Sequence, residues 1–488
     1  MLPPLIERPR PGALNRRRER GVTLALVAVA IFSIVAMAAL SIDIGTLYQA
    51  SAEAQRAADA AALAAARSIS ISGLTGDPLN SSGTWATTCT NATQTAQAVA
   101  QQNSVGGASV PAASISVTYS AGSGAVSPGS ADCSTLGAGF AVNPVVTVKV
   151  SQSSLPTYFS RIWGRTGSSV SATASAEAFN PSNSDTYAGQ VVPVQPRCVK
   201  PLMLPNFEPW ASSGCTNNCT NFVDPTSGAI KSPGILADSP TSAVIGQTFW
   251  LLPDCRHNGA SCSGNMRSNP PQANYTNGSD QYIPPTPNLN LEYLPGQASY
   301  SSTAVPSGSD ACSAVSDNYA QAIAGCDQTT VYQCGVQASG NYVDLSENPG
   351  LADTTNGAQC LIHQGTTNSD NLAALGQDTL QPQWATPPVY PFQIQAGTSN
   401  PLTPVRGDPV TSSTSIVSLP IYDSTQTINT TGTTNVTIIG FLQVFINYVD
   451  GNGNLNVTVM NVAGCGNQAT GTALAGSSPV PVRLITPP

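Results

Sequence analysis

The sequence contains unusually little charge. Only 9% of its 488 residues are Asp, Glu, Lys or Arg, against about 25% in ordinary globular proteins. It has two histidines, so few side chains are available for acid–base chemistry near neutral pH. Eighteen basic and 26 acidic residues give a formal net charge of −8, whereas a nucleic-acid backbone binds clustered positive charge. The composition argues against a housekeeping enzyme and against nucleic acid as a partner.

The motifs of common hydrolases are also missing. Neither His-Glu-x-x-His nor Gly-x-Ser-x-Gly occurs, and the two histidines are far apart in the chain. A zinc site is conceivable from Cys215, Cys219, Cys255 and His257. These residues lack Cys-x-x-Cys spacing, so paired cysteines are the favoured interpretation. We interpret His363 as a packed or surface histidine.

Two further patterns begin like ligand sites but do not complete them. Oxygen donors alternate as they do at the start of a calcium loop: Asp450, Asn452, Asn454 and Asn456. The twelfth position of that loop requires Glu and holds Asn461, so a hairpin turn is favoured. Arg406-Gly407-Asp408 is a tripeptide of low specificity that a solvated loop explains. We therefore predict no catalytic, cofactor-binding or metal-binding residue.

Cysteine is present in an even number, twelve, which predicts disulfides and an oxidising compartment. Two cysteines precede residue 180 and ten follow it, so each region is able to pair its own. We predict a Cys89–Cys133 bond, no free thiol, and no disulfide between residues 1–180 and 181–488. The pairing of the other ten stays open: Cys198, Cys215, Cys219, Cys255, Cys262, Cys312, Cys326, Cys334, Cys360 and Cys465.

One long apolar run lies near the start of the sequence. Gly21–Ile42 has no charge and no proline, and a helix rising about 1.5 Å per residue would cross the roughly 30 Å hydrocarbon layer with it. Residues 1–20 hold six arginines and two glutamates. Basic flanks stay cytoplasmic, so everything after Asp43 is predicted to lie outside. The alternative is a cleaved signal peptide, whose apolar region is shorter, about 7–15 residues.

Strong helix formers continue this run, because Leu47–Ala66 contains neither Gly nor Pro. Small residues recur every three or four positions, a spacing that lets another helix approach closely. The stripe consists of Leu47, Ala50, Ala54, Ala57, Ala58, Ala61, Ala62, Ala64 and Ala66. Two interpretations stay open. The stripe binds an assembly partner through residues such as Ala57 and Ala61, or it packs on its own domain.

A family pattern runs through this region: Glu19-Arg20-Gly21, the apolar run, Asp43-x-Gly45-x-x-Tyr48 and the alanine-rich Gln55–Ala66. It resembles the N-terminal module of TadG-like proteins from bacterial Tad/Flp pilus-assembly systems, over about residues 16–67. Leu155–Phe159 and Val170–Ala174 look like later family segments. The resemblance implies a single-pass inner-membrane protein with a cytoplasmic N-terminus and a periplasmic bulk. It further implies a structural or scaffolding role beside other pilus-assembly proteins.

Two departures limit what the resemblance implies. Many family members carry a von Willebrand A-type domain with an Asp-x-Ser-x-Ser metal site, and this string is absent; Asp344–Asn348 lacks the second Ser. Leu26 stands where the pilins of these systems have the Glu of the prepilin-peptidase signature. We therefore transfer no metal site and expect the anchor to stay attached.

The predicted fold is a transmembrane helix with an Ala-rich extension, a small α/β domain and a β-rich, disulfide-stabilised domain. The predicted ranges are 1–20 for the basic tail, 21–67 for the helix, 68–180 for the α/β domain, 181–189 for a linker and 190–488 for the β-rich domain. Within 68–180 we expect a helix at Thr90–Val105, strands at Ser114–Tyr119, Val145–Ser151 and Ser169–Ala176, and a short helix over 155–163. Beyond residue 190 the best strands are Gln247–Leu252, Pro391–Gln395, Ser415–Tyr422, Asn435–Val449 and Leu455–Val462, the last two joined by a turn at 450–454.

We expect membrane lipid and pilus-assembly proteins as partners, the latter through the Ala-rich helix. The alternative function is a membrane-tethered adhesin or ligand-binding module, which a groove lined by Trp210, Trp250 or tyrosines would favour. A hydrolytic enzyme is the third hypothesis.

Overall fold

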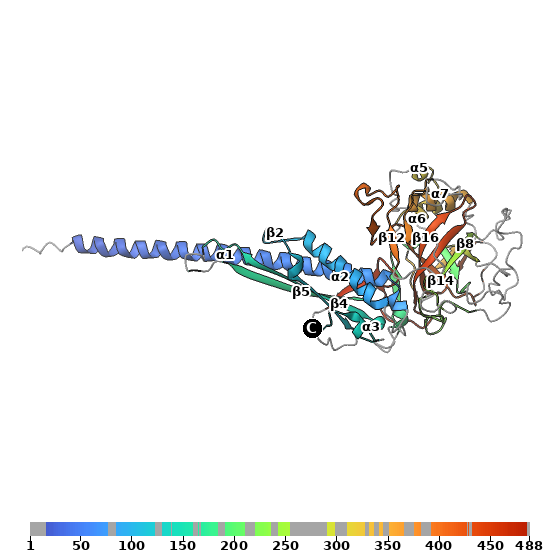
Figure 1. Ribbon diagram of the computed structural model, residues 1–488, viewed down its shortest axis with the longest axis horizontal. Helices are drawn as coiled ribbons and strands as arrows, with labels where there is room; N and C mark the ends of the chain where they lie inside the picture. The colour runs from blue at the N-terminus through green and yellow to red at the C-terminus, as the bar shows by residue number, and fades with distance from the viewer. Residues whose placement is uncertain are drawn as a thin grey trace, which may run out of the picture.

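The computed structural model describes most of the chain. A long helix projects from a folded body (Figure 1). The described residues are 16–76, 84–122, 129–137, 139–159, 164, 167–183, 191–209, 220–235, 243–253, 290–297, 310–326, 331–335, 341–344, 351–365, 375–381, 392–426, 428 and 432–485.

Helix α1, Arg16–Ile71, has 56 residues and is continuous from the apolar run through the alanine segment. At about 1.5 Å per residue it is roughly 84 Å long. It ends where Gly73 takes the left-handed conformation, with φ of 80°. The prediction of one long helix, apolar at first and Ala-rich in its extension, is confirmed.

A four-stranded antiparallel sheet with order β19-β5-β4-β3 packs along the second half of α1. Its strands are β3 Ile115–Ala121, β4 Pro144–Leu155, β5 Ser168–Ala178 and β19 Val482–Ile485. Alternate residues such as Val146, Val148 and Val150 are buried against the helices, as the period of a strand requires. The three strands predicted within residues 68–180 are confirmed.

Helix α2, Thr84–Gln102, lies beside α1 on the same domain (Figure 1). Ala92, Ala96 and Ala100 are fully buried and face the alanines of α1 in one core. The helix starts six residues before the predicted Thr90, which lies inside it. Short elements complete this domain: η1 Leu74–Gly76, β1 Ser104–Val105, β2 Ala108–Ser109, η2 Ala112–Ser114, η3 Cys133–Thr135, α3 Gly139–Val142 and η5 Pro181–Asn183.

Strand β19 was not predicted. Val482 pairs with Ala178 and Ile485 with Ser175, so residues 482–485 extend the sheet of the first domain. Arg483 adds a salt bridge to the buried carboxylate of Glu177. The range 190–488 therefore contributes its last described strand to the domain predicted at 68–180, and the C-terminus lies beside that domain (Figure 1).

The larger domain is built on a closed six-stranded barrel with order β14-β16-β17-β8-β9-β7. Its strands are β7 Leu202–Pro205, β8 Thr248–Pro253, β9 Asn290–Pro295, β14 Ile416–Tyr422, β16 Ile438–Val449 and β17 Leu455–Gly464. Four of them, β8, β14, β16 and β17, were predicted with bounds shifted by a few residues. Strands β7 and β9, which close the barrel, were not. Side chains from all six form the main core.

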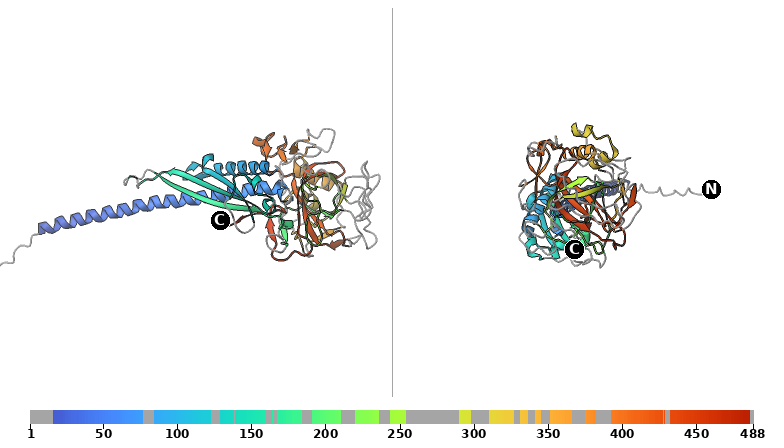
Figure 2. Two further views of the ribbon diagram at one scale, coloured as in Figure 1. Left: turned by 60° about the horizontal axis from the view of Figure 1, so that its bottom comes forward. Right: turned by 90° about the vertical axis from the view of Figure 1, so that its right-hand side faces the viewer.

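Smaller elements surround the barrel (Figure 2). They are β6 Val194–Pro196, α5 Asp310–Ser313, α6 Asn318–Ala324, β10 Tyr342–Asp344, α7 Leu351–Ile362, β11 Thr379–Gln381, β12 Gln393–Gln395, η7 Thr403–Val405, β13 Pro409–Val410, β15 Thr433–Asn435 and β18 Leu474–Gly476. The β12 strand was predicted; helices α6 and α7 were not. Asp317 caps α6 by accepting hydrogen bonds from the backbone N–H groups of Tyr319 and Ala320.

The disulfides follow the predicted partition. Cys89 bonds to Cys133, as predicted. In the second domain the described pairs are Cys198–Cys326, Cys312–Cys360 and Cys334–Cys465. Among the described cysteines none joins residues 1–180 to 181–488, and none is free.

Two predicted features lie only partly in the described residues. Of the short helix expected over 155–163, residues 155–159 are described: Leu155 ends β4 and residues 156–159 form no helix. Of the linker expected at 181–189, residues 181–183 form η5 and the rest lie outside the described residues.

Candidate functional site

The first feature with functional meaning is the exposed apolar surface of α1. Leu24, Phe32 and Met37 are each more than 70% exposed, and their neighbours along residues 22–42 are similar. Apolar side chains avoid water, so a stripe this long calls for an apolar environment. The helix has the length and composition to cross a membrane.

Asp43 marks the end of this apolar stretch and holds a distant loop. Its carboxylate accepts hydrogen bonds from the backbone N–H of Tyr158 at 2.9 Å and from that of Phe159 at 3.1 Å. The side chain is 5% exposed. The β4–β5 hairpin runs back along α1 (Figure 2), and the Asp43 hydrogen bonds fasten it where the apolar stretch ends. Sequence reasoning used Asp43 as the end of the membrane segment and as part of a family pattern, and did not predict its contact with residues 158 and 159.

The alanine stripe of α1 is an internal packing surface. Ala54, Ala57, Ala58, Ala61 and Ala62 are completely buried against α2 and the sheet. Their small side chains let these elements approach the helix backbone closely. The expectation that partners bind through Ala57 and Ala61 is wrong in this respect, because neither side chain is accessible. The alternative, packing on its own domain, holds.

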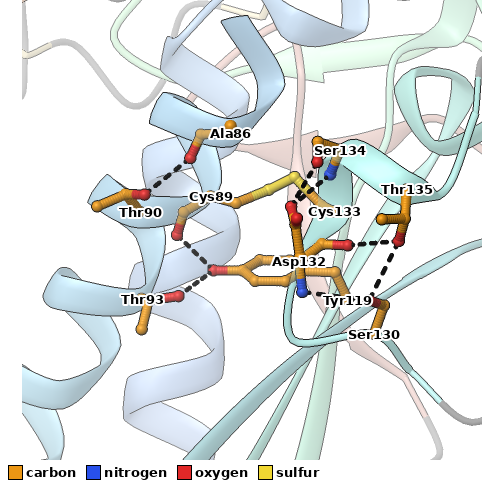
Figure 3. Close-up of a disulfide and its surroundings, with 10 residues drawn as sticks. All are labelled: Ala86, Cys89, Thr90, Thr93, Tyr119, Ser130, Asp132, Cys133, Ser134 and Thr135. Atoms are coloured by element: carbon orange, nitrogen blue, oxygen red, sulfur yellow. Dashed lines mark hydrogen bonds between the residues drawn. A yellow bond between two sulfur atoms is a disulfide. The ribbon is translucent and has the colours of Figure 1, made fainter. Parts of the chain in front are cut away.

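The Cys89–Cys133 disulfide ties α2 to the segment after β3, with Tyr119 beneath it (Figure 3). The Tyr119 hydroxyl donates to the Cys89 carbonyl at 2.7 Å and lies 2.7 Å from the Thr93 hydroxyl. Burial raises the pKa of Tyr119 to about 12, so its proton stays in place. Asp132 accepts from the backbone N–H and the hydroxyl of Ser134. These bonds lower the pKa of Asp132.

Buried amides join the two domains. Asn461 on β17 donates to the Ser70 carbonyl at 2.8 Å, near the end of α1. Asn180 donates to the Val462 carbonyl at 3.0 Å and to the Thr75 carbonyl at 3.2 Å. Both asparagines are fully buried, where a lost hydrogen bond is expensive. The long helix is thereby fixed to the barrel. Sequence reasoning considered Asn461 only as a failed calcium ligand.

A groove of about 470 Å³ lies at the same boundary, between α1, α2 and the β12–β13 strands. Its lining combines amide side chains, such as Asn91 and Gln94, with the apolar Ile71 and Phe392. A smaller hollow of about 160 Å³ lies between α1, Gly106 and the end of β4. Trp250 lines neither of these hollows; it stacks edge-on against Tyr448 with ring centroids 5.1 Å apart. Trp210 lies outside the described residues.

The sequence candidates for metal binding have other roles or are not described. Asp450 accepts from the backbone N–H groups of Asn452 and Asn454, which makes the predicted hairpin turn. His363 is buried, and burial lowers its pKa. Cys215, Cys219, Cys255 and His257 lie outside the described residues. Over the ranges given above, no three His, Cys, Asp or Glu side chains cluster in a way that would hold a metal ion.

Two other sequence patterns are loop or strand-end features. Arg406, Gly407 and Asp408 are exposed between η7 and β13, as a solvated loop would be. Asp344 is the last residue of β10, and residues 345–348 of the incomplete metal motif lie outside the described residues.

Comparison with known proteins gives one match. Residues 21–68 match the Tad family model, described as Flp pilus-assembly TadE/G-like. The matched segment begins with the apolar stretch, contains Asp43, and ends within the buried part of α1. No curated protein and no solved structure matches the chain.

Proposed function

From this match at residues 21–68, we propose that the chain is a membrane-anchored structural component of a Tad/Flp-type pilus-assembly apparatus. The observation that carries the proposal is that the matched segment, residues 21–68, lies entirely within α1. The same helix is apolar and exposed in its first half and is the buried spine of a domain in its second half.

The anchoring role is supported by the two halves of α1 together. A core helix of a soluble protein would bury its most apolar stretch, whereas here residues 22–42 are exposed except around Ala36 and Ala39, and the alanine stretch is buried. Membrane insertion would cover the exposed half without changing the rest of the fold.

The orientation follows from charge and from redox chemistry. Six arginines against two glutamates precede the apolar stretch, which keeps that side cytoplasmic. The disulfides all lie after it, and such bonds persist in oxidising compartments. The two domains would then stand on the periplasmic face of the inner membrane.

A structural role, without catalysis, is proposed from composition and rigidity. The sequence offers two histidines and few charges for chemistry. The long helix, the disulfides and the buried Asn461 bond instead make a stiff connection between membrane and barrel. A scaffold that positions pilus-assembly proteins needs such stiffness.

The test is genetic complementation in a bacterium that carries this gene. Deleting the gene should abolish surface pili, and the full chain should restore them. A chain whose residues 1–42 are replaced by a cleavable signal peptide should not restore them, because it is released. A matched control, with residues 22–42 replaced by an unrelated apolar span of equal length, should restore assembly. Normal pili in the deletion strain would refute the proposal.

A further inference from the structure

Asp43 connects the membrane-exit point of α1 to a second element. It is the first charged residue after Gly21–Ile42, yet the residue is only 5% exposed. Two adjacent backbone N–H groups, of Tyr158 and Phe159, donate to it. Hydrogen bonds to a carboxylate are among the stronger ones. The end of β4 and the residues that follow it, 155–159 (the hairpin tip), are thus fixed to one position along the helix axis.

That position corresponds to the polar edge of a bilayer. Residue 43 lies one residue, about 1.5 Å along the axis, beyond Ile42, the last residue of the charge-free run. The headgroup layer adds about 5–7 Å on each side of the hydrocarbon core. A loop fastened at residue 43 therefore lies at headgroup depth whenever residues 22–42 span the hydrocarbon.

The side chains at this level suit a lipid interface. Tyr158 is 59% exposed and Ile44 is 44% exposed. Tyrosine is enriched at membrane interfaces because its ring prefers the acyl boundary and its hydroxyl prefers water. Two separate elements therefore present exposed side chains at this level: the hairpin tip with Tyr158 and α1 with Ile44. Tyr48, which is 74% exposed, lies about 9 Å beyond Ile42 along the axis, just outside the headgroup layer.

We propose that the tip of the β4–β5 hairpin, residues 155–159, rests on the bilayer surface as a second membrane contact beside α1. Asp43 is the positioning residue that holds it there. The proposal rests on the proposed membrane anchoring of α1. Residues 155–159 contact the headgroup layer of the membrane that α1 crosses, because they lie directly beside the end of the exposed apolar stretch.

A second membrane contact would fix the tilt and rotation of α1, which a single spanning helix leaves free. A single helix is able to tilt and rotate in a bilayer, and its orientation is set by interfacial anchors. With the hairpin tip as a second support, the sheet packed on α1 and the barrel bonded to it keep a set direction relative to the membrane.

The experiment measures depth with spin labels on the full chain in vesicles of phosphatidylethanolamine and phosphatidylglycerol. Single cysteines are introduced as Phe32→Cys in the apolar stretch, Tyr158→Cys at the tip and Leu402→Cys in the barrel domain, where Leu402 is 65% exposed. Tyr158→Cys keeps the backbone N–H that Asp43 accepts from. Relative collision rates with oxygen and with a water-soluble nickel complex report the depth of each label.

We expect the label at residue 158 to give a depth between those at residues 32 and 402. A value at residue 158 equal to the aqueous value at 402, with residue 32 in hydrocarbon, would overturn this inference and leave the anchor intact. An aqueous value at residue 32 would instead refute the anchor itself.

A second measurement tests the positioning role. Asp43→Ala should increase the mobility of the label at residue 158, because it removes both acceptor oxygens. Asp59→Ala is the matched control, since Asp59 lies on the same helix and, among the described residues, accepts a hydrogen bond from the side chain of Gln55 alone, at 2.8 Å. Unchanged mobility at residue 158 in Asp43→Ala would overturn the role given to Asp43.

Discussion

Replacing Ala61 with Glu tests whether the alanine stripe is internal. Ala61 is completely buried between α1, α2 and the sheet, whereas Ala52, nine residues earlier on the same helix, is exposed. The structure predicts that Ala61→Glu unfolds or degrades the domain and that Ala52→Glu is neutral. If the stripe were a partner surface, Ala61→Glu would instead leave a stable protein that fails to bind.

The magnitude follows from what the new side chain meets. Burying a polar group without a hydrogen bond costs about 1–3 kcal/mol in protein mutants. Forcing extra atoms into a packed core costs about 1–3 kcal/mol more. The total of about 2–6 kcal/mol is a large part of a typical stability of about 5–15 kcal/mol. An exposed substitution such as Ala52→Glu changes stability by about 0.5 kcal/mol or less.

Thermal unfolding of the purified full chain in detergent measures the difference. Each kcal/mol corresponds to about 2–4 °C in Tm for a domain of about 150–250 residues, so Ala61→Glu should unfold well below Ala52→Glu. Cellular abundance should fall in the same order. Equal Tm and equal abundance for the two variants would refute the internal packing of the stripe.

Three further predictions concern bonds inside the domains. Tyr119→Phe loses its hydrogen bonds to the Cys89 carbonyl and Thr93 and should destabilise by about 1–3 kcal/mol in denaturant titration; no change would show that the hydroxyl is dispensable. Removing both Cys89 and Cys133, 44 residues apart, should lower the free energy of unfolding by about 4 kcal/mol, because the unfolded chain gains loop entropy. Reductant should then lower the Tm of the wild type more than that of the variant, which keeps the other disulfides. Burial raises the pKa of Glu208 in the native state above its ordinary value of 4.5. The protonated carboxyl therefore stabilises the native state below pH 4.5, and this contribution is lost as the pH rises through the raised native-state pKa. Glu208→Gln should therefore gain stability relative to wild type on going from pH 4 to pH 7, and parallel pH curves would contradict the assignment.

Local patterns predicted the elements whose signal lies within their own residues. The charge-free run and the Gly- and Pro-free alanine segment predicted α1, and alternating residues predicted β3, β4 and β5. Barrel strands β8, β14, β16 and β17 were predicted for the same reason. Strand β7 is an apolar run of only four residues, and β9 interrupts its apolar residues with Asn290 and Glu292. Closing a barrel also depends on strand tilt and register between segments far apart in the chain.

The site was harder to predict because its contacts are distant in sequence. Asp43 bonds to residues 115 and 116 positions later, and no local pattern marks that pairing. Alanine spacing is the same for packing within one chain and between chains, so only the fold decides which occurs. Asn461 looks like any strand asparagine until its partner, the Ser70 carbonyl, is known.

The pairing of β19 with β5 sets an order of events for the newly made chain. Residues 175–178 must wait for residues 482–485, roughly 300 positions later, before the sheet is complete. Because a chain is synthesised from its N-terminus, the whole barrel emerges in the interval. During that time β5 presents an open edge of unpaired backbone groups, which is the kind of surface that captures foreign strands. The sheet of the first domain is therefore completed only after the barrel has been made. A chain interrupted within the barrel leaves the edge of β5 open to misassembly or to proteases.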